Sequence, residues 1–82
     1  MPVKSLTPKS RSAAALGKAI KQAREALDLT QLALAHKLGY KGSDAGAYVS
    51  RVECGLQEPR LASLKRFAKA LRVSVADLLG AK

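Results

Sequence analysis

The chain has 82 residues, a formal net charge of +9 and a sequence pI near 10.2, with 48% hydrophobic but only 4% aromatic residues. A chain of this length buries only about 60% of the surface that it exposes when unfolded, which excludes two independent cores. The sequence shows neither an apolar run of about 18 residues, as a membrane span needs, nor an apolar stretch at its start, so we expect a cytoplasmic protein.

Reactive side chains are scarce. Cys54 is the single cysteine and His36 the single histidine, so the chain offers no internal disulfide and too few soft ligands for a structural zinc site. A nucleophile also needs a base within hydrogen-bond reach and a group that orients the base, and no such set is predicted around either residue. We therefore expect no enzyme, no metal and no cofactor.

The charge is unevenly distributed. Fifteen Lys and Arg against six Asp and Glu favour polyanionic partners. The first acid, Glu25, is preceded by Lys4, Lys9, Arg11, Lys18, Lys21 and Arg24. Residues 1–11 also hold Pro2 and Pro8 and show no apolar period, which predicts a disordered basic arm followed by one domain at 12–82. Such an arm suits nucleic acid, and the alternative is a solvated tail that only aids solubility.

Five short helices and no strand are predicted after the arm. The first has a possible N-cap at Ser12, ends near Asp28 and carries an apolar stripe at helical spacing: Leu16, Ile20, Ala23 and Leu27. The second follows a cap at Thr30, is stopped by Gly39 and has Leu34, Ala35 and Leu38 on one face.

The third helix is capped by Ser43 or Asp44, ends at Gly55 and turns one face inward: Ala45, Val49 and Val52. The fourth follows Pro59 and carries Leu61, Leu64, Phe67, Ala68 and Leu71. The fifth is short, contains Leu78 and Leu79, and opens with Ser74 and Asp77 at the spacing of a capping box.

Two short helices joined after a glycine are typical of a helix-turn-helix, whose second helix enters the major groove of DNA. Residues 16–79 go further and resemble the Cro/repressor-type, lambda-repressor-like helix-turn-helix family. The pieces that carry the resemblance are Ala23-Arg24-Glu25, Leu29-Thr30-Gln31, Leu34-Ala35, Leu38-Gly39, Val49-Ser50-Arg51-Val52-Glu53, Gly55, Pro59, Leu61, Leu64, Phe67-Ala68-Lys69-Ala70-Leu71 and Val73-Ser74. Their order and spacing together are specific, although no single piece is.

The resemblance implies an all-α, five-helix domain that binds double-stranded DNA as a transcriptional regulator, most simply a homodimeric repressor, autoregulator or controller protein on an inverted-repeat operator. Two alternatives are an antitoxin bound to its toxin and a protein-binding module that uses the same fold. A membrane-surface role for the helix at 12–27 is disfavoured, because its own core needs the Leu and Ile stripe.

Site residues follow from the helix pattern and from the resemblance. Opposite its inward face, the third helix presents Asp44, Ala47, Tyr48 and Arg51, with Ser50 in the same motif. Arg51 can hold guanine O6 and N7 together or grip a phosphate. The resemblance places Gln31 on the DNA backbone. It also pairs Arg24 with Glu53 across the fold.

Three departures from the family pattern affect the site. The link at 40–48 is longer than usual, which leaves two outcomes: a longer turn that brings Lys41 to the phosphates, or a helix begun one turn earlier at Ser43. Ala33 replaces the Glu of a capping box. Arg60 replaces a Ser or Thr cap and can meet a phosphate instead. We expect the dimer interface at Leu56, Val75 and Leu79.

Overall fold

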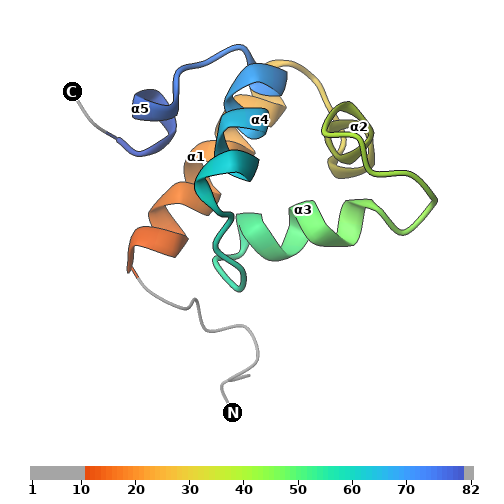
Figure 1. Cartoon of the computed structure of the whole chain (residues 1–82), viewed down its shortest axis with the longest axis horizontal. Helices are drawn as coiled ribbons and strands as arrows, with labels where there is room; N and C mark the ends of the chain where they lie inside the picture. The colour runs from red at the N-terminus through yellow and green to blue at the C-terminus, as the bar shows by residue number, and fades with distance from the viewer. Residues whose placement is uncertain (1–10, 81–82) are drawn as a thin grey trace.

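The helical architecture is seen in a computed structural model that describes residues 11–80. In chain order the helices are α1 (Arg11–Ala26), α2 (Gln31–Lys37), α3 (Gly46–Glu53), α4 (Leu61–Leu71) and α5 (Val75–Leu78). No strand occurs in this part of the chain, so the predicted all-α, five-helix fold is confirmed (Figure 1). Residues 1–10 of the expected arm lie outside the described residues.

The first helix begins earlier than predicted and ends where predicted. Arg11, expected in the arm, is the first residue of α1, and Ser12 lies in its first turn, so Ser12 is not the N-cap. At the other end Asp28 adopts the left-handed conformation with a φ of 56°, and the Leu29 amide donates back to the Arg24 carbonyl. Asp tolerates this conformation better than most residues, which explains the sharp turn into α2.

The second helix has the predicted ends. The hydroxyl of Thr30 accepts a hydrogen bond from the Ala33 amide at 3.0 Å, which satisfies one of the free amides of the first turn. Gly39, with a φ of 100°, stops the helix two residues after Lys37. Because Ala33 carries no carboxylate, the hydroxyl works without the reciprocal half of a capping box.

The start of α3 decides between the two outcomes for the long link. The helix begins at Gly46, and no side chain caps it, so the caps predicted at Ser43 or Asp44 are wrong. The reason is a turn before the helix, in which the Asp44 carbonyl accepts from the Ala47 amide and the Ala45 carbonyl from the Tyr48 amide. Backbone carbonyls thus satisfy amides that a side-chain cap would have served. Residues 39–45 form a long turn, named below the 39–45 turn.

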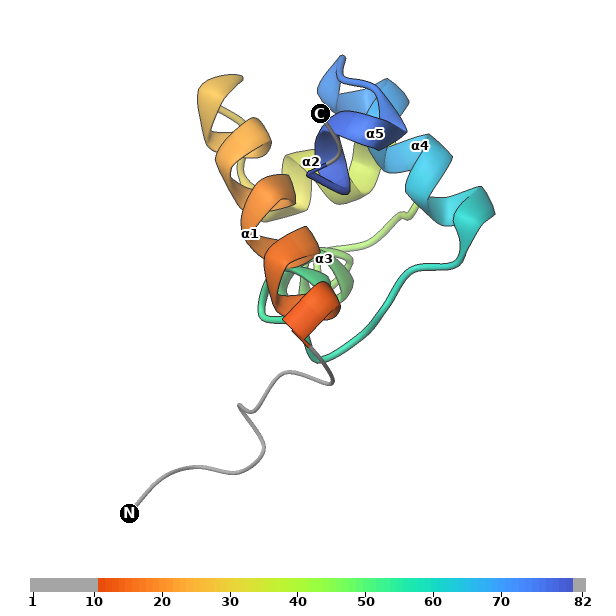
Figure 2. The ribbon, with the colours of Figure 1, turned by 90° about the vertical axis from the view of Figure 1, so that its left-hand side faces the viewer.

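Close approach of backbones brings α3 against both of its neighbours. A Cβ placed on Gly17 of α1 would lie 2.4 Å from the Glu53 carbonyl oxygen and 2.5 Å from that of Val52. A Cβ on Gly46 would lie 3.2 Å from the Leu32 amide nitrogen in α2. These two glycines therefore let α3 lie directly against α1 and α2 (Figure 2).

The core lies between α1, α2, α3 and α4, and α5 closes it with Leu78. Its largest fully buried side chains are Phe67, Ile20, Leu34, Val49 and Val52. Two predicted core residues are exposed instead. Leu27 is 38% exposed because α1 ends at Ala26, one residue before it. Leu61 is 61% exposed because it starts α4 at the surface.

The C-terminal part follows the prediction more closely. Arg60 occupies the N-cap position of α4 without a side-chain hydrogen bond, and α4 ends at Leu71, followed by the C-cap residue Arg72 with a φ of 60°. Ser74 and Asp77 form the predicted capping box at the start of α5. None of the helices within residues 11–80 has the length and apolar character that crossing a membrane requires.

Candidate nucleic-acid interface

One buried carboxylate fixes α3 to α1. The Nε of Arg24 donates to Oε2 of Glu53 at 2.6 Å, and its Nη2 donates to Oε1 at 3.2 Å, so the ion pair implied by the family resemblance is present. The remaining Nη1 donates to the Leu29 carbonyl at 2.7 Å. A planar guanidinium thus links the end of α1, the turn that follows it and the end of α3.

The same carboxylate also holds α2. The Gln31 amide nitrogen donates to Oε1 of Glu53 at 3.0 Å, so the first residue of α2 is bonded to the last residue of α3. In the protein without DNA, the Gln31 amide group is therefore bonded to Glu53. The sequence predicted a phosphate contact for Gln31 and not this internal bond. The hydrogen bonds that Arg24 donates to Glu53 raise the pKa of Arg24 further above its ordinary value, while burial opposes this.

The predicted outer stripe is only partly solvent-accessible, and Asp44 precedes α3 in the 39–45 turn. Asp44, Ala47 and Arg51 are exposed, whereas Ser50 and Tyr48 are half-buried. Since Val49 and Val52 point into the core, only one side of α3 is available to a ligand.

Arg51 is oriented by a residue that the sequence analysis did not single out. Its Nε donates to Oε1 of Gln57 at 3.1 Å. The Nη atoms form no hydrogen bond with other residues in 11–80. Gln57 follows Gly55, whose φ of 76° turns the chain back beside α3. The guanidinium is therefore held along one edge and leaves two amino groups for base edges or a phosphate.

Tyr48 has a packing role as well as a place on the stripe. Its ring centroid lies 5.0 Å from that of Tyr40 and 6.0 Å from that of Phe67. Burial raises the pKa of Tyr48, and the neighbouring Tyr40 adds to this while Arg51 opposes it. The row of three rings ties the 39–45 turn through α3 to α4, and Tyr40 was missed because a lone aromatic in a loop gives no periodic signal.

The 39–45 turn presents polar side chains beside α3. Lys41, Ser43 and Asp44 are all exposed. The Nε2 of His36 lies 3.2 Å from the Gly42 carbonyl oxygen, and this contact joins α2 to the turn. The positive φ of Gly42 lets the chain change direction there. The sequence predicted no role for His36 in the fold, so this contact with the turn was missed. The turn therefore has a defined shape, with Lys41 on its surface.

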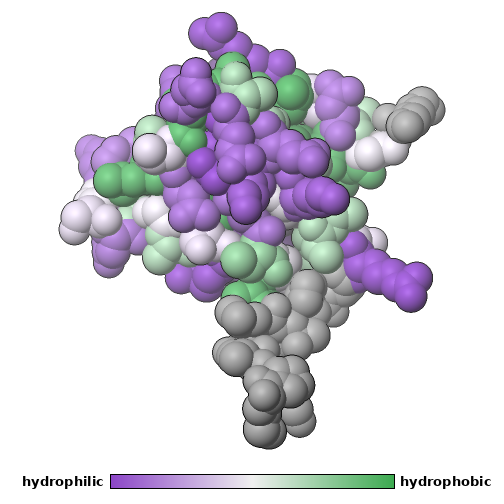
Figure 3. All heavy atoms as spheres, turned by 180° about the vertical axis from the view of Figure 1, so that it is seen from behind, coloured by the Kyte–Doolittle hydropathy of each residue, from purple (hydrophilic) through white to green (hydrophobic). Residues whose placement is uncertain are grey.

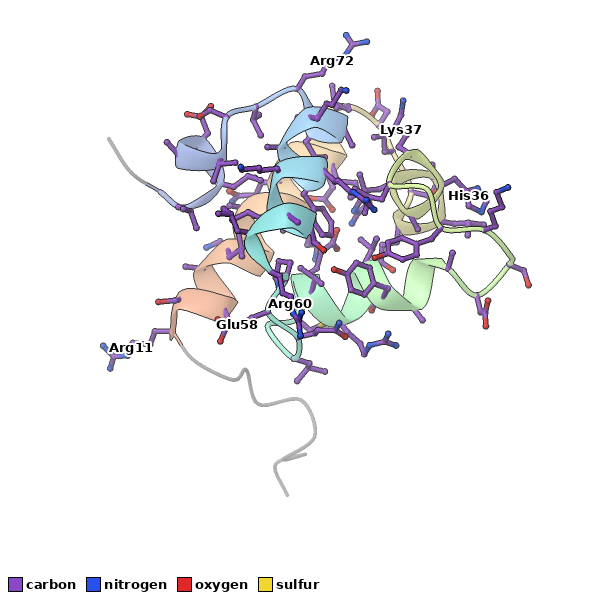
Figure 4. The ribbon with its side chains drawn as sticks, in the orientation of Figure 1. Arg11, His36, Lys37, Glu58, Arg60 and Arg72 are labelled. Atoms are coloured by element: carbon purple, nitrogen blue, oxygen red, sulfur yellow. The ribbon has the colours of Figure 1, made fainter. Side chains whose placement is uncertain are left out.

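On the other side of α3, Arg60 is exposed at the start of α4 (Figure 4). Together Lys41, Arg51 and Arg60 place positive charge before, along and after the exposed stripe. Within residues 40–60, the exposed acidic residues are Asp44 and Glu58. This excess of exposed cations over acids suits a polyanion with a curved surface, since cations lie on both sides of the helix that would enter a groove.

The three residues expected at a dimer interface have different environments. Leu56 is half-buried in the loop after α3, and Val75 is half-buried and packs against the core. Leu79 is 58% exposed, and it borders a surface hollow of about 300 Å³ between α5 and the start of α1. Of the three, Leu79 offers the most uncovered apolar surface.

Two further surfaces bear on the alternatives. Leu16 and Ile20, the apolar stripe of α1, are buried in the core, and hydrophilic side chains gather over the outward side of α1 (Figure 3). This helix therefore has no apolar face left for a membrane.

His36 and Cys54 are exposed, and no group of three His, Cys, Asp or Glu within residues 11–80 is arranged to hold a metal.

Comparison with known proteins gives one family. The model of a helix-turn-helix family matches residues 20–78, which is well over half of the chain and includes α2 and α3 entirely. No significant match was found among curated proteins or solved structures. Helices α2 and α3 lie against each other with one exposed stripe flanked by cations, as DNA binding by such a unit requires. The chain belongs to the lambda-repressor-like helix-turn-helix family of DNA-binding proteins.

Proposed function

We propose that the protein is a sequence-specific regulator of transcription that binds double-stranded DNA as a homodimer. The observation that carries this proposal is the exposed stripe of α3, on which the Nη groups of Arg51 have no partner within residues 11–80. A bidentate contact of this kind to guanine contributes roughly 1–3 kcal/mol of discrimination. Binding DNA would place the protein in the cytoplasm, as the sequence analysis expected.

Each site residue then has a distinct part. Arg51 reads a base edge and Ala47 leaves room for a thymine methyl group, while Lys41 and Arg60 hold phosphates on either side. Asp44, Ser43 and Ser50 lie close enough to the stripe to tune the choice of sequence. Gln31 reaches a phosphate only by sharing or exchanging its hydrogen bond with Glu53.

A dimer is the simplest way to obtain specificity from so short a helix. The eight residues of α3 span only about 12 Å, so one copy reads a few base pairs. Two copies related by a two-fold axis read half-sites about 34 Å apart and gain affinity without new contacts. The exposed Leu79 and the adjacent hollow at the start of α1 support placing the interface there.

The test is selection of bound duplexes from a random-sequence library at about 0.15 M salt, where specific binding exceeds non-specific binding by at least about 10³. We expect an enriched inverted repeat. With the selected duplex, Arg51→Gln lowers the affinity roughly 5- to 150-fold for each half-site, and the two losses multiply in the dimer. The matched variant Arg72→Gln removes the same charge at the far end of α4 and changes it less than about 2-fold.

Other outcomes separate the alternatives. Retention of DNA without enrichment would mean that the protein binds the backbone alone, and the proposed sequence specificity would be wrong. A selected sequence without symmetry would argue against the dimer. No retention at all, together with copurification of a second protein, would favour an antitoxin or another protein-binding module.

A further inference from the structure

A second basic surface lies away from α3. Two adjoining hollows, of about 410 and 260 Å³, run between the end of α2 and the last turns of α4 and share Lys37, Ala70 and Arg72. We call this surface the α2–α4 groove. Its lining residues are Leu27, Leu29, Lys37, Leu38, Arg66, Lys69, Ala70 and Arg72.

The groove has basic walls and an apolar floor. Arg66, Lys69 and Ala70 fall on one face of α4, since they are three and four residues apart, and Lys37 faces them from α2. The four cations are exposed, and none forms an ion pair with another residue in 11–80. No acid lines either hollow.

Local helix stability accounts for only part of this charge. Lys37, Lys69 and Arg72 lie near helix C-terminal ends, where a cation interacts favourably with the helix dipole. Arg66 lies in the middle of α4 and gains nothing from that end. Four unpaired cations around one groove repel one another, so an anionic occupant would stabilise them together.

The position of the groove separates it from the proposed DNA surface. Arg60 begins α4 on the side of α3, whereas Arg72 ends it, and Figure 4 shows Arg72 and Lys37 at the opposite end of the molecule from Arg60. The eleven residues of α4 span about 16 Å. The end of α4 that lines the groove therefore lies away from the residues proposed to hold a duplex at the start of α4 (Figure 4).

The chemistry of the groove selects one class of occupant. A phosphate backbone would complement the cations but would leave Leu27, which is 38% exposed, and Leu29 without an apolar partner. A second copy of this chain has only six acids, of which Glu53 and Asp77 are already bonded internally. We infer that the α2–α4 groove docks an acidic segment of another protein, with carboxylates on the four cations and apolar side chains on the floor.

The test uses the full chain and a fluorescein-labelled peptide in which glutamates surround leucines at positions i and i+4. At about 0.15 M salt we expect micromolar binding by fluorescence anisotropy. The double variant Arg66→Gln, Lys69→Gln weakens it at least about 10-fold. The matched control Lys18→Gln, Lys21→Gln removes the same charge from exposed positions on α1 and changes it less than about 2-fold.

Three further measurements complete the test. Lys37→Gln, on the opposite wall, should weaken peptide binding as well, which guards against a folding defect in the double variant. A peptide with serine in place of leucine should bind more weakly. The groove double variant should bind the selected DNA duplex within about 2-fold of the wild type.

Clear results would overturn the inference. These are equal losses of peptide affinity in both double variants, unchanged affinity for the serine peptide, or a larger loss of duplex affinity than of peptide affinity in the groove variant. The last would assign the groove to nucleic acid. Because the peptide measurement needs no DNA, failure of the proposed DNA-binding function would leave it interpretable.

Discussion

At the scale of single residues, Glu53 is the side chain that joins α3 to both α1 and α2. It accepts two hydrogen bonds from Arg24 and one from Gln31, and the side chains of Arg24 and Glu53 are 11% and 3% exposed. A carboxylate this buried is tolerated because each oxygen has a donor. Removing one donor leaves the buried charge without that partner and lowers the free energy of unfolding.

We therefore predict that Arg24→Met lowers the free energy of unfolding by about 3–5 kcal/mol, measured by urea denaturation, because it leaves the Glu53 carboxylate buried without its cation. Lys21→Met, on the exposed side of the same helix, should change it by less than about 0.5 kcal/mol. Equal unfolding curves for Arg24→Met and the wild type would contradict the role assigned to the pair.

The pair was available from the sequence only through the family resemblance, because Arg24 and Glu53 are 29 positions apart and no local pattern joins them. The bond from Gln31 to Glu53, and that from Arg51 to Gln57, were not predicted. A polar side chain at the surface has many partners within reach, and the sequence does not rank them. Tertiary packing decides which bond forms.

At the scale of helices, the prediction was best where the signal is local. The caps at Thr30 and Ser74 and the ends at Gly39 and Gly55 depend on residues within a few positions, and the structure has them. The start of α3 was wrong because backbone carbonyls in the 39–45 turn replace a side-chain cap. Such a bond involves no residue preference, so it leaves no mark in the sequence.

The contact between α1 and α3 predicts the direction in which Gly17→Ala changes the free energy of unfolding. Alanine in place of glycine within a helix ordinarily stabilises it by about 1 kcal/mol. At Gly17 a methyl group would collide with the carbonyl oxygens of Val52 and Glu53, which belong to the backbone and cannot rotate away. We predict that Gly17→Ala lowers the free energy of unfolding by roughly 1–3 kcal/mol, measured by urea denaturation.

A substitution on the exposed side of the same helix is the control. Ser12→Ala should be close to neutral, since Ser12 is exposed in the first turn and is not a cap. A stabilising effect of Gly17→Ala would show that α1 and α3 can separate at low cost, contrary to the close approach described above.

The capping box of α5 predicts a dependence of stability on pH. Hydrogen bonds from the Ser74 amide and hydroxyl lower the pKa of Asp77 below its ordinary value of 3.8. The contribution of Asp77 is thus complete above pH 3.8 and disappears as the pH falls through the lowered pKa. Below about pH 4, Asp77→Asn should flatten the loss of stability, measured as melting temperature against pH. Equal slopes for Asp77→Asn and the wild type would contradict this role of the capping box.

At the scale of the whole molecule, seven of the cations within residues 11–80 form two separate groups. Lys41, Arg51 and Arg60 lie before, within and after α3, while the cations of the α2–α4 groove come from the end of α2 and from the middle and end of α4. The net charge of +9 was evident from composition, and it indicated a polyanionic partner. The grouping of these seven cations on two surfaces was not evident, because segments distant in the sequence build each surface.

This division predicts how DNA affinity responds to salt. A dimer with about 6–8 phosphate contacts gives a slope of log affinity against log salt near −5 to −7. Arg60→Gln should reduce the magnitude of the slope by about 1 per lost contact, or about 2 for the dimer, measured by anisotropy titrations. Arg66→Gln should leave the slope unchanged, and a slope near zero for the wild type would argue against a DNA partner.

The row formed by Tyr40, Tyr48 and Phe67 contains both tyrosines and the single phenylalanine of a chain that has no tryptophan. Every aromatic chromophore of the protein therefore lies where the 39–45 turn meets α3 and α4. Intrinsic ultraviolet emission comes from this one junction, with no indole to accept the excitation energy. The fluorescence of the unlabelled protein consequently monitors the side of α3 next to the proposed DNA surface.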